Sequence, residues 1–160
     1  MHRNYLKKKH IVGVCSGGGH LTELLAILKH IPEVEEVITE TEVAERNKSE
    51  TVRFLPLVDP HRSVLLYLKN IACSIYLALK VRPDVVISTG AGMTVPFFLM
   101  CRLLGSTCIW IESGARIKTP AKSSKFSYKF AHLFVSQSSE LKKFFPDSHV
   151  QSIIPPVEKP

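Results

Sequence analysis

Cysteine is scarce in this sequence, and no two cysteines are spaced as a metal-binding or redox pair. The four cysteines each lie within an apolar run and form no CxxC motif; they are Cys15, Cys73, Cys101 and Cys108. This pattern argues against a disulfide framework and predicts free thiols in a reducing compartment. The sequence also lacks a DxD motif and a cluster of histidines and carboxylates, so we expect no metal requirement.

A continuous apolar segment of membrane-spanning length is missing as well. The most apolar stretch, residues 64–81, is interrupted by Lys69 and Asn70, so it falls short of the roughly 20 uninterrupted apolar residues that cross a bilayer. The first nine residues are basic, and neither an apolar signal-peptide core nor a small-residue cleavage site follows them. We therefore expect a cytoplasmic protein without a cleaved leader.

Acidic residues are the minority among the charged ones. The sequence has 21 lysines and arginines against 14 aspartates and glutamates, which gives a formal net charge of +7. This excess predicts an anionic partner, which is a phosphorylated ligand, an anionic membrane surface or nucleic acid. Nucleic acid is the least favoured, because the basic residues are dispersed, are not interleaved with aromatic residues and match no recognition motif.

Short β-rich runs alternate with helical stretches along nearly the whole chain. The 160 residues, 45% of them hydrophobic, are enough for one domain with an ordinary core. The alternation predicts an α/β fold with a Rossmann-like parallel sheet and helices on both faces. We expect a basic segment at 1–9, the domain at 10–154 and a tail at 155–160. The expected strands are 10–15, 36–39, 52–57, 84–88, 107–112, 133–135 and 150–154, and the main expected helices are 20–30, 62–81, 93–104 and 138–145.

A glycine-rich turn, CSGGGH at residues 15–20, follows the first expected strand and opens the first helix. Such a turn presents free backbone N–H groups and the positive end of a helix dipole, which together suit a phosphate or diphosphate. It is not a GxGxxG motif, because Thr22 replaces the third glycine, and no GK[ST] follows for a P-loop. The turn predicts an anion site at Gly17, Gly18 and Gly19, or else only close packing of the strand against the helix.

His20 lies in the first turn of the same helix. There the helix dipole disfavours the imidazolium, and a neutral imidazole can act as a general base. Glu23, three residues on, shares this helix face and could orient the ring or complement the helix N-terminus. The alternative is that His20 only forms a hydrogen bond with a neighbouring carbonyl.

A second glycine turn, STGAGMT at residues 88–94, follows the central expected strand. The carboxyl ends of parallel strands share one edge, where doubly wound sheets bind ligands. We therefore expect Gly90, Gly92 and Thr94 beside the first turn as part of the same ligand site.

A carboxylate, Glu112, ends the next strand. It is either a functional group or a strand-end residue paired with Arg116. Arg116 begins a polar segment with several lysines, which could cover a bound anion or be a solvated charged loop.

The stretch 64–81 is apolar on nearly all sides, which is more than one buried helix face needs. It is expected either to lie in a membrane interface or to pack against a partner subunit or a neighbouring helix. The residues expected to make this contact are Leu65, Leu68, Ile71, Ile75 and Tyr76.

Four segments, GGGHLTE, RPDVVISTGAGMTVP, IWIESGARI and LFVSQSSELKKFFP, resemble one family in their order and spacing. The family is the Alg14-like one, whose members are the acceptor-side, membrane-recruiting subunits of the two-chain UDP-GlcNAc transferase of lipid-linked oligosaccharide synthesis. It includes bacterial relatives in capsular and exopolysaccharide synthesis. Differences from the eukaryotic pattern at Ser124, His132 and Ser138, and the lack of an expected membrane anchor, favour the bacterial type.

The resemblance implies the N-terminal Rossmann-like half of a GT-B glycosyltransferase, with the UDP-sugar held by a separate partner subunit and no tightly bound cofactor in this chain. It implies inverting transfer of a sugar to a polyprenyl-diphosphate-linked saccharide, by a complex that is peripheral at the inner face of the cell membrane. The acceptor-diphosphate and base roles would fall on Gly17, Gly18, Gly19 and His20. The other matching motif positions are Glu23, Gly90, Gly92, Glu112, Ser113 and Arg116.

Two other classes of protein fit the sequence. One is a non-catalytic membrane scaffold that only recruits the partner subunit. The other is a Rossmann-like protein that binds a free nucleotide by itself.

Overall fold

A computed structural model describes residues 9–31, 33–47, 49 and 51–153. Apart from Lys9, the basic segment predicted at 1–9 lies outside the described residues, as does the predicted tail at 155–160. The domain predicted at 10–154 is described for all but a few of its residues.

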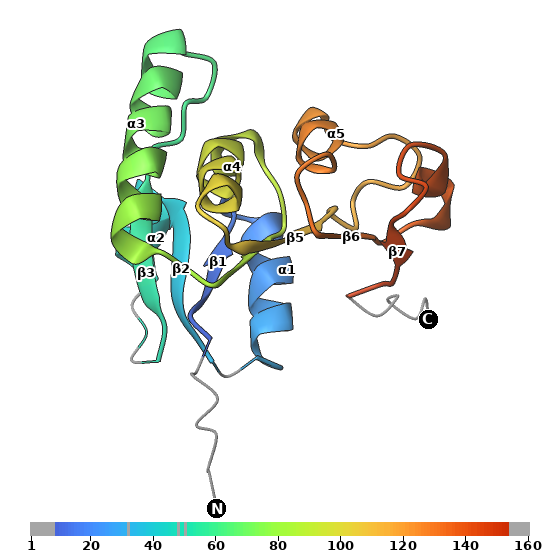
Figure 1. Cartoon of the computed structure of the whole chain (residues 1–160), viewed down its shortest axis with the longest axis horizontal. Coiled ribbons are helices and arrows are strands. Elements are labelled where there is room, and N and C mark those ends of the chain that lie inside the picture. The colour runs from blue at the N-terminus through green and yellow to red at the C-terminus, as the bar shows by residue number, and fades with distance from the viewer. Residues whose placement is uncertain (1–8, 32, 48, 50, 154–160) are drawn as a thin grey trace, which may run out of the picture.

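The described residues form one seven-stranded sheet in which every strand pairs in parallel with its neighbours. The strand order is β3-β2-β1-β4-β5-β6-β7, so the chain first builds outward from β1 in one direction and then from β4 in the other (Figure 1). The strands are β1 (Ile11–Val14), β2 (Val34–Glu40), β3 (Arg53–Leu57), β4 (Val85–Ser88), β5 (Thr107–Ile111), β6 (Leu133–Ser136) and β7 (His149–Val150).

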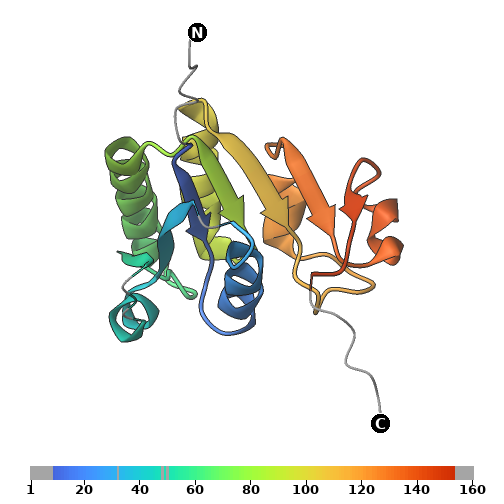
Figure 2. The ribbon, with the colours of Figure 1, turned by 90° about the horizontal axis from the view of Figure 1, so that it is seen from below.

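Helices cover both faces of the sheet, as the alternating sequence pattern predicts (Figures 1 and 2). One face carries α1, whereas α3, α4 and α5 lie over the other. The helices are α1 (Gly19–Leu28), α2 (Thr41–Arg46), α3 (Val64–Val81), α4 (Val95–Leu103) and α5 (Lys122–Ser127), with 3₁₀ turns η1 (Gly92–Thr94) and η2 (Ser139–Lys143).

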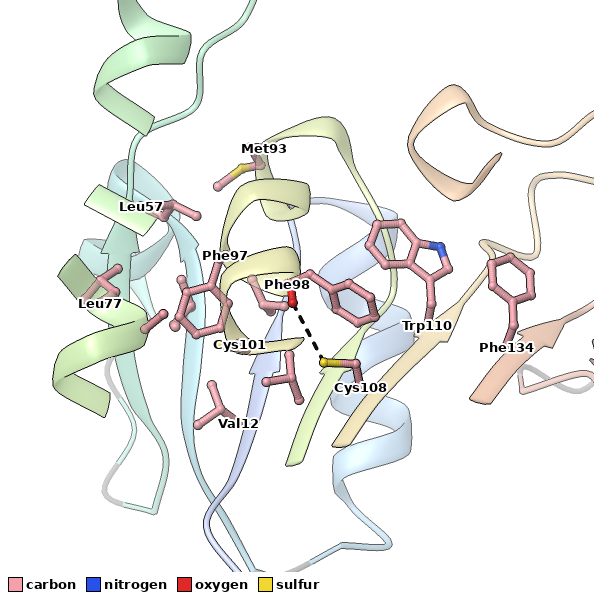
Figure 3. Packing of buried hydrophobic residues seen from close by; sticks show 14 of the residues in the cluster. Val12, Leu57, Leu77, Met93, Phe97, Phe98, Cys101, Cys108, Trp110 and Phe134 are labelled. Atoms are coloured by element: carbon pink, nitrogen blue, oxygen red, sulfur yellow. Dashed lines mark hydrogen bonds between the residues drawn. The ribbon is translucent and has the colours of Figure 1, made fainter. Parts of the chain in front are cut away.

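The larger core lies between the sheet and the α3–α4–α5 layer (Figure 3). Phe98 of α4 packs edge-on against Trp110 of β5, with ring centroids 5.1 Å apart. The indole N–H of Trp110 donates to the Ser124 hydroxyl at 3.0 Å, which ties α5 to the sheet. These contacts hold the helices of this face in place over the strand ends.

The cysteines are free thiols, as predicted. Burial raises the pKa of Cys15 to about 12 and that of Cys108 to about 11, so both thiols stay protonated at neutral pH. The Cys108 thiol lies 3.7 Å from the Phe98 carbonyl oxygen (Figure 3). These cysteines therefore act as small core residues.

Two expected helices differ from the structure, and proline explains both differences. The stretch expected as one helix at 93–104 divides into η1 and α4, because Pro96 occupies the first turn of α4. The helix expected at 138–145 is the shorter 3₁₀ turn η2, which does not extend to Phe145 because Pro146 disfavours a helical backbone there. The last strand is also shorter than predicted, because its partner β6 ends at Ser136 and pairs only as far as Val150.

Candidate functional site

The two glycine turns lie at the point where the order of the strands reverses. β1 and β4 are neighbours, while their sequence successors β2 and β5 lie on opposite sides of this pair. Crevices at such points, at the carboxyl ends of the strands, are where sheets of this kind bind ligands. The predicted site residues after β1 and β4 are therefore brought together.

The first glycine turn exposes backbone donors at the start of α1. The first helical hydrogen bond runs from the Thr22 N–H to the Gly18 carbonyl, so the N–H groups of Gly19, His20 and Leu21 precede it. Gly18 has φ of 66° and, like Gly19, is exposed, with no atom within 4 Å of where a Cβ would lie. These two residues leave room for an anion to approach the backbone.

Gly17 has a different role from its two neighbours. Its N–H donates to a Glu40 carboxylate oxygen at 3.0 Å, and a Cβ at this position would lie 2.8 Å from Val43. Gly17 is therefore required for close packing against the β2–α2 corner, whereas the accessible part of the turn is Gly18 and Gly19.

The His20 ring is held in one orientation by the second turn. Its Nδ1 lies 2.7 Å from the Thr89 carbonyl oxygen, and the Thr89 hydroxyl donates to the His20 carbonyl oxygen, also at 2.7 Å. Because a carbonyl oxygen only accepts, Nδ1 carries the hydrogen, and the neutral ring then has its lone pair on Nε2. His20 is half-buried, so it both forms the predicted carbonyl contact and keeps a proton acceptor at the site.

Of the two roles predicted for Glu23, orienting the His20 ring is not the one that its hydrogen bonds support. One oxygen of its carboxylate accepts hydrogen bonds from the Ser113 hydroxyl at 3.1 Å and from the Gly114 N–H at 2.9 Å. The side chain is only 5% exposed, and its second oxygen has no hydrogen-bond partner among the described residues. Glu23 thus ties α1 to the loop that follows β5, and Thr89 is the residue that orients the imidazole.

Strand alternation explains why Ser113 reaches α1 while Glu112 does not. Ile111 faces the α1 side of the sheet and Trp110 faces the opposite side. Because side chains alternate along a strand, Ser113 lies on the same side as Ile111, and Glu112 lies on the same side as Trp110. The loop is also held from β6, where the Gln137 side-chain amide donates to the Glu112 carbonyl oxygen at 3.1 Å. Gln137 lies within the LFVSQSSELKKFFP segment, but sequence reasoning missed its role because the contact with Glu112 is made across the sheet.

Glu112 is buried, with 1% of its surface exposed. Desolvation raises the pKa of its carboxyl, and hydrogen bonds from Ser124 and from the backbone, together with the charge of Arg116, only partly oppose this shift. Among the ion pairs of the described residues, none joins Glu112 to Arg116 within 4.0 Å. Arg116 is exposed, so its guanidinium is accessible to an anion.

The second glycine turn contains one accessible glycine and one buried glycine. Gly90 is buried with φ of 107°, and a Cβ there would lie 3.2 Å from the His20 ring. Thr94 is also buried, and its hydroxyl donates to the Ala91 carbonyl oxygen at 2.9 Å. Gly92 is exposed, with no atom within 4 Å of a Cβ position. Gly90 and Thr94 therefore shape the turn, and Gly92 is its accessible residue.

The predicted contact face of α3 is exposed. Leu65 is 78% and Tyr76 61% exposed, Leu68 and Ile75 are also exposed, and Ile71 is half-buried. By length and composition, α3 is the one helix of the described residues that could cross a membrane. Its opposite face is occupied by the domain, however, because Asn70, Ser74, Leu77 and Ala78 are buried there. Membrane and partner remain the two predicted occupants of the exposed face.

A hollow of about 560 Å³ lies elsewhere, between the end of α1 and the starts of β2 and β3. Its lining includes Leu28, Val34 and Phe54, at the amino edge of the sheet. The glycine turns lie at the opposite edge, so this hollow is separate from the candidate site. Among the described residues, no group of three histidine, cysteine or acidic side chains is arranged to hold a metal.

The parallel sheet and the paired turns at its reversal point define a Rossmann-like α/β protein of the kind that forms one half of a GT-B glycosyltransferase. MurG from Acinetobacter baumannii shares this fold, with a TM-score of 0.64 and 16% identity over 80% of this chain. UDP-GlcNAc 2-epimerase from Methanocaldococcus jannaschii has a TM-score of 0.66 and 15% identity over 86% of this chain. The chain spans only 41% and 42% of those two structures.

The chain belongs to the family of Alg14-like oligosaccharide biosynthesis proteins, whose profile matches residues 59–154. The human UDP-N-acetylglucosamine transferase subunit ALG14 is 25% identical over 86% of this chain and 79% of its own length. The mouse subunit of the same name is 26% identical over 84% of this chain and 78% of its length. The family predicted from the four motifs is thus confirmed, and the bacterial type stays a prediction.

Replacing Glu23 with alanine should destabilise the protein by about 1–3 kcal/mol, because the buried Ser113 hydroxyl and the Gly114 N–H would lose their acceptor. Urea unfolding measures this change. The control is Glu45→Ala at an exposed position of α2, which should stay within about 0.5 kcal/mol of the wild type. Equal effects of the two substitutions would contradict the loop-anchoring role.

Gly90→Ala should destabilise the protein by about 1–3 kcal/mol, since its φ is unfavourable for alanine and the new methyl group would meet His20. Gly92→Ala is the matched control in the same turn, and it should change stability by less than about 1 kcal/mol. Chemical denaturation of both variants tests the difference. A Gly92 variant as unstable as the Gly90 variant would show that the turn is generally intolerant of side chains.

Glu112→Gln should change how stability depends on pH. Because the folded state raises the pKa of Glu112, it binds a proton more tightly than the unfolded state, and the stabilisation present below the ordinary value of 4.5 is lost as pH rises through the folded pKa. Between the ordinary and the raised pKa, the free energy of unfolding of the wild type should fall by up to about 1.4 kcal/mol per pH unit relative to that of the variant. Unfolding titrations from pH 4 upward measure it, and a constant difference between the two proteins would refute the shift.

Proposed function

We propose that this chain is the acceptor-side subunit of a two-chain glycosyltransferase that moves a sugar from a UDP-sugar to a polyprenyl-diphosphate-linked saccharide. The observation that carries this proposal is the His20–Thr89 pair, which places a proton acceptor, Nε2, beside a helix N-terminus with free N–H groups. A general base next to an anion site is what transfer to a hydroxyl of a diphosphate-linked acceptor requires.

The acceptor diphosphate would bind at the accessible parts of the site. Gly18 and Gly19 supply backbone N–H groups at the positive end of α1, and Gly92 lies on the adjacent turn. Arg116 and Lys118 are exposed on the loop that Glu23 anchors, so they can approach the same charge. The buried residues Gly90, Thr94, Glu112 and Ser113 would hold these groups in position without touching the ligand.

The base would be Nε2 of His20. In the proposed step it takes the proton of the acceptor hydroxyl while the hydroxyl oxygen attacks the anomeric carbon of the donor sugar. The bond from that carbon to the diphosphate of the nucleotide breaks, its electron pair leaves with UDP, and the configuration of the sugar carbon inverts. The hydrogen bond from Nδ1 to Thr89 keeps the tautomer that this step needs.

The nucleotide would be held by a partner chain. The glycine turn of this chain is not a GxGxxG motif. The names of the mammalian relatives describe them as subunits, which supports an assembly of two chains. This chain would be inactive without the nucleotide-binding subunit.

The exposed apolar side of α3 would bring the complex to the membrane. Leu65, Leu68 and Tyr76 lie on this side, and Lys80 and Arg82 at its end are exposed cations. An apolar helix face with flanking cations suits an anionic membrane interface. We propose a peripheral location at the inner face of the cell membrane, where lipid-linked acceptors are present.

His20→Ala should lower sugar transfer about 10²–10⁴-fold, the usual contribution of a general base, while the complex stays membrane-bound. The assay uses membranes that contain this chain with its candidate partner, a UDP-sugar and a lipid-diphosphate acceptor. His30→Ala, at an exposed position just after the same helix, is the matched control and should keep its activity close to that of the wild type.

Full activity of His20→Ala would make the turn architectural and this chain a scaffold that recruits the partner. Tight binding of UDP to the isolated chain would instead favour a protein that binds a nucleotide by itself. Both results would contradict the proposal, and they separate its two rivals from each other.

A further inference from the structure

An apolar groove lies between α3 and α4, and Phe126 of α5 also contributes to its lining. It has a volume of about 240 Å³. Two parallel rows of side chains four residues apart form its sides, namely Tyr67, Ile71 and Ile75 on α3 and Val95, Leu99 and Leu103 on α4. No charged residue lines it.

The groove begins at the edge of the sheet that carries the glycine turns. α3 follows β3 and α4 follows β4, so both helices start at the carboxyl edge and run toward the amino edge side by side (Figure 1). Val95 comes directly after η1, which ends the second glycine turn. One end of the groove is therefore adjacent to the proposed diphosphate site, and the other end, at Ile75 and Leu103, points away from it.

Cationic side chains lie beside the end of the groove that is next to the glycine turns. Tyr67 also lines a smaller hollow together with His61 and Arg62, both of which are exposed. The groove thus passes from a cationic mouth to a purely apolar interior. A ligand with an anionic head and a hydrocarbon tail matches this arrangement in both charge and polarity.

A buried polar contact fixes the α3 wall relative to the second glycine turn. Asn70 is fully buried on α3, and its side-chain amide donates to the Met93 carbonyl oxygen of η1 at 3.1 Å and to the Val58 carbonyl oxygen at 2.6 Å. The groove and the turn therefore keep one relative position, as expected of a largely pre-formed site.

We propose that this groove binds the first isoprenoid units of the polyprenyl acceptor, with the diphosphate at the Gly92 end. This inference rests on the proposed function and adds a second site to it. The volume is below the roughly 300–1,000 Å³ of pockets that enclose whole ligands, so it fits a short section of a long chain. A partner helix, about 10–12 Å across with its side chains, is too wide for such a groove. A flat membrane surface would meet Leu65 and Leu68, which are exposed and lie outside the groove.

The test measures dissociation constants of the full chain for isopentenyl, geranyl and geranylgeranyl diphosphate by titration calorimetry. Affinity should rise with chain length, by about tenfold or more from the first probe to the last, because each further isoprenoid unit buries apolar surface. Leu99→Trp fills the groove at a half-buried position and should remove this dependence while leaving inorganic diphosphate binding unchanged. The control Leu79→Trp, at an exposed position of α3 outside the groove, should behave like the wild type.

Inorganic diphosphate and geranylgeraniol separate the two proposals. If inorganic diphosphate binds but affinity does not depend on prenyl length, the groove assignment is overturned and the anion site stands. If geranylgeraniol binds with the same sensitivity to Leu99→Trp and inorganic diphosphate does not bind, the groove is supported and the proposed anion site fails. If Leu99→Trp weakens binding to vesicles of phosphatidylglycerol that contain no prenyl lipid, the membrane occupies this surface, which also overturns the groove assignment.

Discussion

The parallel pairing of β1 with β4 is the constraint on which the rest of the site depends. Val14 and Ser88 are register partners, so the residues that follow them leave the sheet at the same height. This places Thr89 within hydrogen-bond distance of His20, and the two residues then bind each other through both a side chain and a carbonyl. A side chain at Gly90 would meet the imidazole. One strand pairing and one missing Cβ therefore determine where the proton acceptor lies and which nitrogen carries the hydrogen.

Local patterns predicted the elements well, because each depends on neighbours in sequence. Strand runs, glycine turns and the apolar surplus of α3 could be recognised in this way. The roles of single site residues could not, since they depend on contacts across the sheet. Glu23 shares a helix face with His20, yet its carboxylate binds residues about 90 positions away, because β5 follows β4 in the sheet and its end lies near α1. Gly17 is likewise required by Glu40 and Val43 on the next βα corner.

Two helices act as rigid supports for the carboxyl edge of the sheet, where the candidate site lies. α1 carries His20 in its first turn and the loop anchor Glu23 one turn later, so His20 and the loop with Arg116 keep a fixed relation. α3 is fixed to the second glycine turn through Asn70. Any surface that binds the exposed side of α3 is thereby held at a set distance from that turn. Positioning by such elements is more precise than positioning by free loops, because packed helices move as units.

The charges of the site also favour a division of the proposed reaction between two chains. The acceptor and the donor each carry a diphosphate, and two such groups repel each other strongly when they are held close in a region of low dielectric. In the proposed function, the exposed Arg116 and Lys118, with the start of α1, would counter one of them. In the proposed arrangement the partner chain would hold the other diphosphate at a distance. In that arrangement the reacting hydroxyl and the sugar carbon meet only when both chains are in place, so assembly itself would control the reaction.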